Sequence, residues 1–252
     1  MRRVLTALIC LLLPARVKPP LLRLLGHRVA NSARIAPSLV WVNRLALGPK
    51  SRIGPGNLIS VRRVLLRERA YIGYGNLILG PLCLAFAPIG AIGNRNVVLR
   101  TRAPSLALGP VLWLGEGSKI TAGHHIDLTR TIRFGAWSTL AGKGSQIWTH
   151  GYVHLSQGSG RSRVDGRVWI GDNVYIGAGS VVGPGVTIVD GVSIGSLSSV
   201  AADLLEPGLW VSQKLRHIAL TPEERIDRLP IISPPEEREQ VRWKGPHRPD
   251  RA

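Results

Sequence analysis

The chain is poor in acidic residues, and the shortage is uneven along its length. Its 252 residues include 33 Lys and Arg against 15 Asp and Glu, a formal net charge of +18. Between Met1 and Arg102 the only acidic residue is Glu68. This excess has three explanations: a nucleic-acid partner, an anionic membrane surface, or an arginine-rich composition with no partner behind it.

Aromatic residues and cysteines are also scarce. Aromatic residues make up 5% of the chain, the basic residues are spread singly through aliphatic stretches, and no nucleic-acid-binding motif is present. We therefore expect no nucleic-acid partner. The two cysteines, Cys10 and Cys83, form no spaced pair, so the sequence offers neither a disulfide framework nor a thiolate zinc site.

The N-terminal apolar run is too short to cross a bilayer. Residues 4–13 follow Arg2 and Arg3 and number ten, whereas about 20 are needed to span. After Pro14 a second stretch mixes leucine with arginine, which favours a basic amphipathic segment lying in a membrane interface. A secretory signal peptide is the alternative, although no small-x-small cleavage site follows Leu13. We expect a cytoplasmic protein held peripherally on the anionic inner membrane.

A six-residue repeat dominates the second half of the chain. An aliphatic residue recurs every six positions, often followed by glycine, and a second small or β-branched residue recurs two positions before it. The first column is Ile170, Ile176, Val182, Ile188, Ile194 and Val200, and the second is Val168, Val174, Ser180, Val186, Val192 and Ser198. In a triangular coil of three short strands, one aliphatic side chain per face points inward and the glycine helps the chain turn the corner. The register predicts an all-β fold, a left-handed parallel β-helix.

The repeat continues upstream with less regularity. Leu114, Ile120, Ile126 and Ile132 keep the spacing of six, and Leu128, Phe134 and Leu140 continue it in a frame shifted by two. The shift indicates an irregular corner, not a new domain. Ile53, Ile72 and Ile92 recur at 19 and 20 residues, about one coil each.

These spacings divide the chain into three parts. Residues 1–32 form the basic amphipathic segment. Residues 33–203 form the β-helix, with about eight coils, a height of about 40 Å and a loop insertion at 151–165. Residues 204–252 form a cap helix and a tail, because the sequence from Thr221 to Glu224 has the features of a helix N-terminus.

Function is expected where the regular coil is interrupted. The largest interruption begins at residues 146–154, where the aliphatic register stops and Trp148, His150, Tyr152 and His154 appear. His150 stands directly before the irregular segment, so a coil edge can hold its ring. Aromatic rings here are suited to stacking on sugar faces, although core packing explains Trp148 nearly as well.

The block VWIGDNVYIGAGSVV at 168–182, followed by PGVTI at 184–188, resembles the hexapeptide-repeat acyltransferases, which include galactoside, maltose, serine and polysaccharide O-acetyltransferases. The resemblance implies a homotrimer with active sites between subunits. It also implies transfer of acetyl from acetyl-CoA, without a metal, to a sugar hydroxyl of a surface polysaccharide or its precursor. Serine as acceptor is disfavoured because the helical N-terminal domain of serine acetyltransferases is absent.

The resemblance implies His150 as the general base. In galactoside-type enzymes the catalytic histidine precedes the aliphatic residue of this block by about 19 positions, and His150 precedes Ile170 by 20. A sugar hydroxyl is a poor nucleophile at neutral pH, so an imidazole must accept its proton as the oxygen attacks the thioester carbonyl. His154 is the reserve candidate, with a role in contacting the acceptor alongside Trp148 and Tyr152.

The resemblance also implies a donor site along an outer groove. Tyr175 stands where galactoside-type enzymes have a groove-wall tryptophan. Small residues match positions near the pantetheine, and two basic residues are expected near the nucleotide phosphates. The members of these two sets are Ala178, Ser196, Ala201, Lys214 and Arg216. The sequence before Arg216 departs from the family's glycine-and-proline turn, which leaves the nucleotide end in doubt.

Two other functions are compatible with the same architecture. Gamma carbonic anhydrases use this fold with histidine metal ligands, and His124, His125, His150 and His154 supply enough imidazoles to raise the possibility. The spacing argues against it, because the paired histidines of that family have four intervening residues and His150 and His154 have three. A non-enzymatic scaffold is the other alternative, and it predicts no binding of acetyl-CoA.

Overall fold

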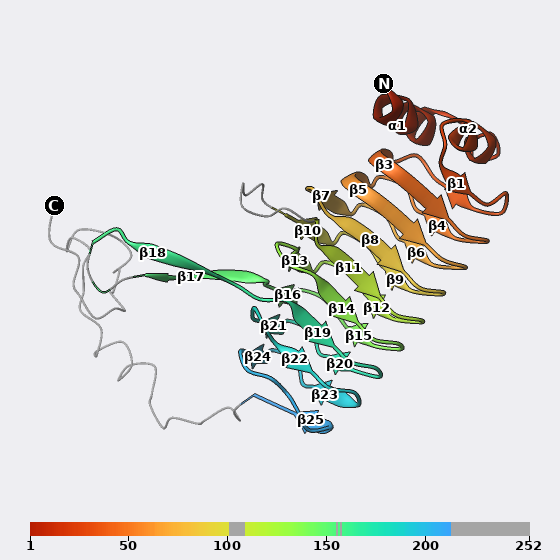
Figure 1. Ribbon diagram of the computed structural model, residues 1–252. Helices are drawn as coiled ribbons and strands as arrows, with labels where there is room; N and C mark the ends of the chain where they lie inside the picture. The colour runs from red at the N-terminus through yellow and green to blue at the C-terminus, as the bar shows by residue number, and fades with distance from the viewer. Residues whose placement is uncertain (101–108, 155, 157, 213–252) are drawn as a thin grey trace, which may run out of the picture. The chain divides into compact units, whose positions relative to one another are not determined.

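Three faces of parallel strands make up most of the protein. The structure is a computed structural model, and it describes residues 1–100, 109–154, 156 and 158–212. Successive coils stack along one axis, with two helices at the N-terminal end and a hairpin projecting from the side (Figure 1). The fold is the predicted left-handed parallel β-helix. The Thr221 helix start, Lys214 and Arg216 lie outside the described residues.

Faces one and two belong to a single sheet, because two long strands bend around the corner between them. These strands are β3 (Leu39–Leu47) and β5 (Leu58–Leu66). Face one continues as β7 (Leu77–Leu79), β10 (Val97–Leu99), β13 (His125–Asp127), β16 (Gln146–Ile147), β21 (Val181–Val182) and β24 (Ser199–Val200). Face two contains β1 (Arg28–Val29), β8 (Cys83–Phe86), β11 (Val111–Leu114), β14 (Ile132–Phe134), β19 (Val168–Ile170) and β22 (Thr187–Ile188).

Face three is a separate sheet of nine short strands. They are β2 (Arg34–Ile35), β4 (Arg52–Ile53), β6 (Tyr71–Ile72), β9 (Ala91–Ile92), β12 (Lys119–Ile120), β15 (Thr139–Leu140), β20 (Tyr175–Ile176), β23 (Val192–Ile194) and β25 (Gly208–Trp210). Nine strands correspond to nine coils, one more than the repeat predicted. The additional coil includes β25, which continues the β-helix past residue 203 into the part expected to form a cap.

Both six-residue columns point into the core. All six members of the aliphatic column and all six of the second column are buried. Upstream, Ile53, Ile72 and Ile92 stack in register on face three, so the spacings of 19 and 20 do mark successive coils. The frame shift after Ile126 is a corner between β13 and β14, as predicted.

Two of the glycines that follow the aliphatic residues, Gly171 and Gly177, serve a different purpose from the one predicted. Gly171 and Gly177 do not have positive φ. A Cβ on Gly177 would lie 2.5 Å from the backbone nitrogen of Ser196 in the next coil, and one on Gly171 would lie 2.7 Å from that of Asp190. Glycine is therefore required because the coils approach closely, whereas positive φ occurs two residues later, at Asn173 and Gly179.

A buried polar ladder runs down the corner between faces three and one. Asn76 donates from its side-chain nitrogen to Asn57 Oδ1 at 2.9 Å, and Asn96 donates to Asn76 Oδ1 at 3.1 Å. The side chains of His124 and Ser180 continue the ladder by accepting backbone N–H bonds from the following coil. The ladder satisfies corner amides that the aliphatic interior cannot.

Two helices close the N-terminal end of the β-helix. They are α1 (Arg2–Leu12) and α2 (Lys18–Leu24), whose Cys10 and Leu22 belong to the same buried apolar cluster as the coils. The buried Lys18 amine donates to the backbone carbonyl of Cys10 at 2.7 Å and to that of Ile35 at 2.9 Å. Among the described residues, no helix is long and apolar enough to span a membrane.

The predicted insertion is an antiparallel hairpin. Its strands are β17 (His150–His154) and β18 (Arg161–Asp165), paired from His150 with Asp165 to His154 with Arg161. The hairpin leaves the β-helix at the corner between faces one and two, and Figure 1 shows it extending away from the coils. His150 therefore lies at the base of the hairpin.

Candidate functional site

His150 is held against a buried carboxylate from the preceding coil. Its Nδ1 lies 2.8 Å from Oδ2 of Asp127, at the corner that follows β13. Asp127 also accepts a hydrogen bond from the Thr129 hydroxyl at 2.8 Å, and Thr129 Oγ1 lies 3.3 Å from His150 Nδ1. The carboxylate and the hydroxyl together fix the orientation of the ring.

The surroundings of Asp127 favour its ionised form. Burial alone would raise the pKa of this carboxyl, but hydrogen bonds from the side chains of Thr149, His150 and Thr129 and from the Thr149 backbone together lower it. The Thr149 backbone nitrogen and hydroxyl lie 3.0 Å and 2.7 Å from Oδ2. Because an ionised carboxylate only accepts hydrogen bonds, His150 Nδ1 must be the donor, and a neutral ring then carries its lone pair on Nε2.

The second ring nitrogen of His150, Nε2, is not used by the contacts described above. Within the described part of the chain, this nitrogen has no hydrogen-bond partner, and the side chain is 20% exposed. A histidine with Nδ1 held by a carboxylate and Nε2 not engaged in a hydrogen bond is arranged to take a proton from an external group. The geometry suits the general-base role that was predicted for His150.

An ion-pair cluster fixes the hairpin base that carries His150. Asp165, opposite His150 on β18, accepts from Arg163 Nε at 2.6 Å and from Arg130 Nε at 3.0 Å. The Arg130 backbone nitrogen also donates to the Thr149 hydroxyl at 2.9 Å. These contacts join the hairpin, which carries His150, to the corner that carries Asp127. One network of hydrogen bonds and ion pairs therefore positions both side chains.

Aromatic rings form a row on either side of His150. Trp148 stacks on His125 with ring centroids 5.4 Å apart, and it meets His150 edge-on at 6.3 Å. Tyr152 meets His150 edge-on at 6.1 Å, and the Arg161 guanidinium lies 4.6 Å from the centre of the Tyr152 ring. Trp148 is half-buried on the outer surface and donates from Nε1 to Gln146 at 2.9 Å, so core packing does not explain it.

His154 does not join the other candidates. It is exposed at the far end of β17, opposite Arg161, and it lies four positions along the extended strand from His150, a distance of about 13 Å. His150 and Tyr152 are therefore brought together, and His154 stands apart from them.

The predicted donor residues fall at three separate places. Tyr175 is exposed on face three between Thr139 and Ser193. Ala178 and Ser196 stack in consecutive coils at the corner between faces three and one, where the Leu197 backbone nitrogen donates to the Ala178 carbonyl at 2.8 Å. Ala201 follows β24 at the corner that His150 occupies two coils earlier. One chain alone does not gather these residues around His150.

Two of the remaining histidines are occupied by local contacts. His124 is buried, with Nε2 2.9 Å from the Thr121 hydroxyl and Nδ1 accepting the Ser145 backbone N–H at 3.2 Å. Burial lowers the pKa of His124 to about 4, so its ring is neutral. His125 stacks on Trp148. In the described ranges, no three His, Cys, Asp or Glu side chains are grouped so that they could hold a metal ion.

Asp127, Thr129 and Thr149 are the site residues that the sequence analysis missed. A signal was present, because the repeat shifts frame at this corner and a lone Asp stands between two inward-pointing residues, Ile126 and Leu128. A carboxylate in that position cannot stay buried without several donors, so it marks a polar site. The six-residue spacing by itself gave no indication that this corner faces the hairpin.

Comparison with known proteins supports the resemblance. Residues 162–202 match the family described as bacterial transferase hexapeptide (six repeats), which confirms what the block at 168–188 predicted. No curated protein matches the chain.

Several solved structures are similar to the chain. A maltose O-acetyltransferase from Clostridium difficile 630 is 31% identical over 40% of this chain and 54% of its own, with a TM-score of 0.37. The polySia specific acetyltransferase NeuO is 16% identical, covering 67% of this chain and 76% of its own, with a TM-score of 0.45. A mutant of AntD, an N-acyltransferase from Bacillus cereus in complex with dTDP and Coenzyme A, is 17% identical. The match covers 71% of this chain and 87% of the AntD chain, with a TM-score of 0.27. The chain thus spans about half the length of the maltose enzyme.

Proposed function

We propose that this protein is an O-acetyltransferase that moves the acetyl group of acetyl-CoA to a sugar hydroxyl, with His150 as general base. The observation that carries the proposal is the His150–Asp127 pair, 2.8 Å apart, at the open base of the hairpin. The hexapeptide match at 162–202 begins in β18 and continues through the coils below the site.

The reaction needs only one proton-transfer group. His150 Nε2 takes the proton of the acceptor hydroxyl while its oxygen bonds to the thioester carbonyl carbon. When the tetrahedral intermediate collapses, the carbon–sulfur bond breaks and the imidazolium returns the proton to the leaving sulfur. The products are the acetylated sugar and the CoA thiol, and the enzyme is unchanged. Asp127 stabilises the imidazolium that exists between the two steps.

The side chains around His150 support a glycan as acceptor. Trp148, which is half-buried, and Tyr152, which is 46% exposed, lie on either side of the base, and aromatic rings stack well on the apolar faces of sugars. Arg161 adds a guanidinium over Tyr152, which suits an acceptor rich in hydroxyl or acidic groups. A surface polysaccharide or its precursor combines these properties.

A homotrimer would complete the donor site. Ala178 and Ser196 lie at a different corner from His150, and Tyr175 lies on a different face, so the donor groove and the base meet only if a neighbouring β-helix supplies one of them. Exposed aromatic side chains on the outer faces, Trp113, Trp137 and Trp169, provide apolar surface for such packing.

The N-terminal helices support a location on the inner face of an anionic membrane. Leu8 and Leu12 of α1 are exposed, and Arg2, Arg16 and Arg23 lie close by in the sequence. Apolar burial in the interface and attraction of about 1 kcal/mol for each nearby basic residue would act together.

An acceptor screen tests the function. Purified protein is mixed with acetyl-CoA and a panel of oligosaccharides, nucleotide sugars and serine, and thiol release is followed together with the mass of the acceptor. We expect acceptor-dependent thiol release and one added acetyl group on a glycan. Absence of acetyl-CoA binding would instead indicate a scaffold.

A further inference from the structure

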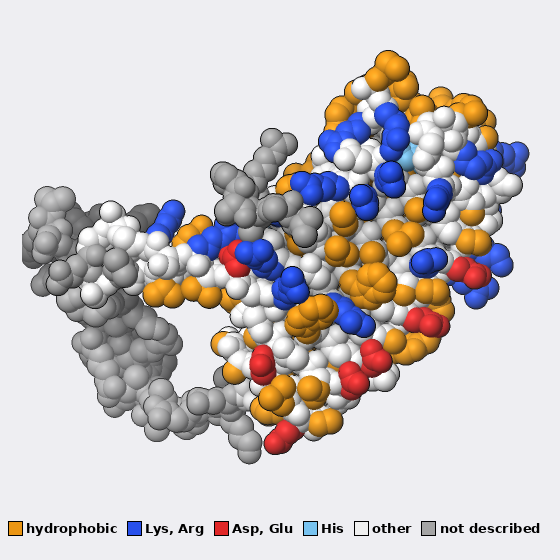
Figure 2. Space-filling view, viewed as in Figure 1, with side chains coloured by type: hydrophobic (Ala, Val, Ile, Leu, Met, Phe, Trp, Pro, Cys, Tyr) orange, Lys and Arg blue, Asp and Glu red, His pale blue; other side chains and the backbone are white. Residues whose placement is uncertain are grey.

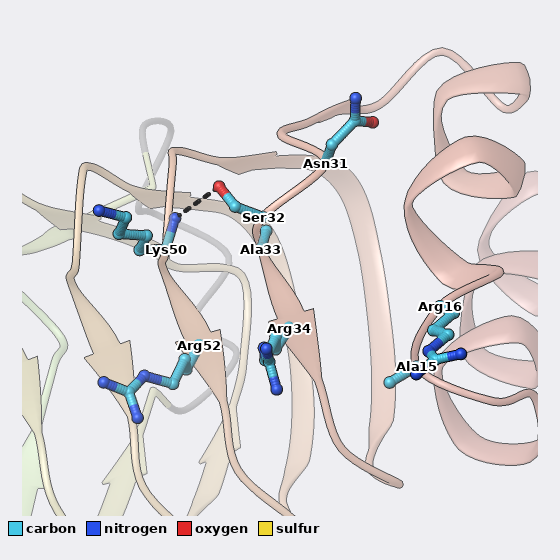
Figure 3. Close-up of a pocket in the computed structure, with 8 residues that line it drawn as sticks. All are labelled: Ala15, Arg16, Asn31, Ser32, Ala33, Arg34, Lys50 and Arg52. Atoms are coloured by element: carbon cyan, nitrogen blue, oxygen red, sulfur yellow. Dashed lines mark hydrogen bonds between the residues drawn. The ribbon is translucent and has the colours of Figure 1, made fainter.

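A basic hollow lies several coils away from His150, at the N-terminal end of the β-helix. It has a volume of about 710 Å³ and lies between the turn that joins α1 to α2 and strands β2 and β4 of face three. Its polar lining consists of Arg16, Asn31, Ser32, Arg34, Lys50 and Arg52 (Figure 3). None of these residues has a part in the proposed acetyl transfer.

Like charges are stacked in this hollow. Arg34 and Arg52 are register partners on adjacent parallel strands, an arrangement that is unfavourable for two cations. Figure 3 shows their side chains on the same side of the sheet, with Arg16 on the turn across the hollow. In the part of the chain that the structure describes, no carboxylate pairs with any of the four cations. A bound anion would remove this repulsion.

The uncharged groups of the lining also offer donors. Ser32 Oγ accepts the Lys50 backbone N–H at 3.0 Å, which leaves the hydroxyl hydrogen available. Asn31 Oδ1 accepts from Arg23 Nη1 at 2.7 Å, which leaves its amide N–H groups available. Guanidinium forks, an ammonium, a hydroxyl and an amide together form a donor-rich lining that matches the oxygens of a phosphate group.

The neighbouring surface indicates where that phosphate comes from. Leu12 is 68% exposed at the end of α1, and Val17 is 41% exposed directly before α2, so apolar side chains flank the turn that lines the hollow. Figure 2 shows hydrophobic and basic side chains together at this end of the β-helix, with most Asp and Glu of that face over later coils. This combination suits a lipid surface and not a soluble anion alone.

We propose that this hollow binds the terminal phosphate of a phosphomonoester membrane lipid. A phosphomonoester carries about −1.5 to −2 charges at neutral pH, so it satisfies several converging cations better than a phosphodiester does. The proposal deepens the membrane location given above and is independent of the acyl transfer. The exposed side chains of Leu12 and Val17 enter the interface while Arg34 and Arg52 hold the head group.

Vesicle binding tests this proposal with a matched pair of variants. Arg34→Gln/Arg52→Gln removes the stacked cations, and Arg44→Gln/Arg63→Gln removes another exposed register pair, from strands β3 and β5 outside the hollow. Affinity is measured by sedimentation with phosphatidic acid vesicles and with phosphatidylglycerol vesicles of equal surface charge. Circular dichroism and thermal unfolding check that each variant is folded.

The expected result is a preference of the wild type for phosphatidic acid of about tenfold. The preference should be lost in Arg34→Gln/Arg52→Gln and retained in Arg44→Gln/Arg63→Gln. Binding to phosphatidylglycerol should weaken by the same amount in both variants, because each loses two positive charges. Equal loss of preference in both variants, no preference in the wild type, or inorganic phosphate binding without vesicle preference would overturn the proposal. Failure of the wild type to bind any anionic vesicle would refute the membrane location itself, whereas absence of acetyl transfer by the wild type would refute only the proposed function.

Discussion

Replacing Asp127 with Asn removes the charge beside His150 while keeping the size of the side chain. The amide oxygen can take the place of Oδ2 and still accept the His150 Nδ1–H bond, now 2.8 Å long. The Thr129 hydroxyl, which donates to Oδ1 at 2.8 Å, can turn and accept from the amide nitrogen. The ring should therefore stay in place, and the main loss is the negative charge that stabilises the imidazolium.

The size of that loss follows from the geometry of the pair. Two unit charges about 4 Å apart interact by about 4 kcal/mol at an effective dielectric constant of about 20. If about half of the proton charge has moved to the ring in the transition state, the loss is about 2 kcal/mol. Because about 1.36 kcal/mol corresponds to a factor of ten in rate, kcat should fall by about 30-fold, and by about 1000-fold if transfer is complete.

Steady-state thiol release at saturating acceptor and donor measures this effect, and calorimetry measures the Kd for acetyl-CoA. We expect the fall in kcat with an unchanged Kd, since Asp127 acts on the acceptor proton through His150. Asp190→Asn is the matched control, because Asp190 accepts the Asp172 backbone N–H at 2.7 Å in an exposed turn away from the hairpin. A folded Asp127→Asn protein with wild-type kcat would show that the carboxylate has no part in the reaction.

Three further outcomes are expected. Thermal unfolding should show a lower Tm for Gly177→Ala than for Gly183→Ala. A Cβ at position 177 would lie 2.5 Å from the Ser196 backbone nitrogen, whereas the nearest atom to a Cβ at position 183 is the Val200 carbonyl oxygen at 3.5 Å. Equal shifts in Tm would contradict the close-approach explanation. Burial raises the pKa of the Cys10 thiol from 9.0 to about 12, so Cys10 stabilises the fold below pH 9 and this contribution is lost as the pH rises towards 12. Cys10→Ala should therefore flatten the alkaline fall in unfolding free energy measured by urea titration, and an unchanged profile would count against burial of the thiol. Light scattering at micromolar concentration should give the mass of a trimer, and a monomer with full activity would refute a donor site shared between subunits.

The six-residue columns predict the core well because their spacing is imposed by the fold itself. Each inward position of a triangular coil recurs once per face, so Ile170 to Val200 could only be buried if the chain coiled in this way. Gly171 and Gly177 were expected to help the chain turn a corner, but their close contacts with the next coil explain them instead. The closeness of Gly177 to Ser196 depends on how neighbouring coils stack, and a single repeat does not contain that distance.

Of the pair at the centre of the site, the sequence predicted His150 but not Asp127, because their contact also depends on how the coils stack. His150 is conspicuous because it stands where the aliphatic register stops. Asp127 comes from the preceding coil, 23 residues earlier, and meets His150 only because parallel coils place corners directly above one another. The hollow at Arg34 and Arg52 has the same origin, since their 18-residue separation becomes an in-register pair only after coiling.

The most direct test of the proposed function compares His150→Ala with His154→Ala at saturating acetyl-CoA and acceptor. Thiol release gives kcat, and calorimetry gives the Kd for acetyl-CoA in each variant. We predict a fall in kcat of about 10²- to 10⁴-fold for His150→Ala with donor binding retained, and turnover within a few-fold of the wild type for the distant His154→Ala. Full activity of His150→Ala, together with loss of activity in His154→Ala, would contradict it.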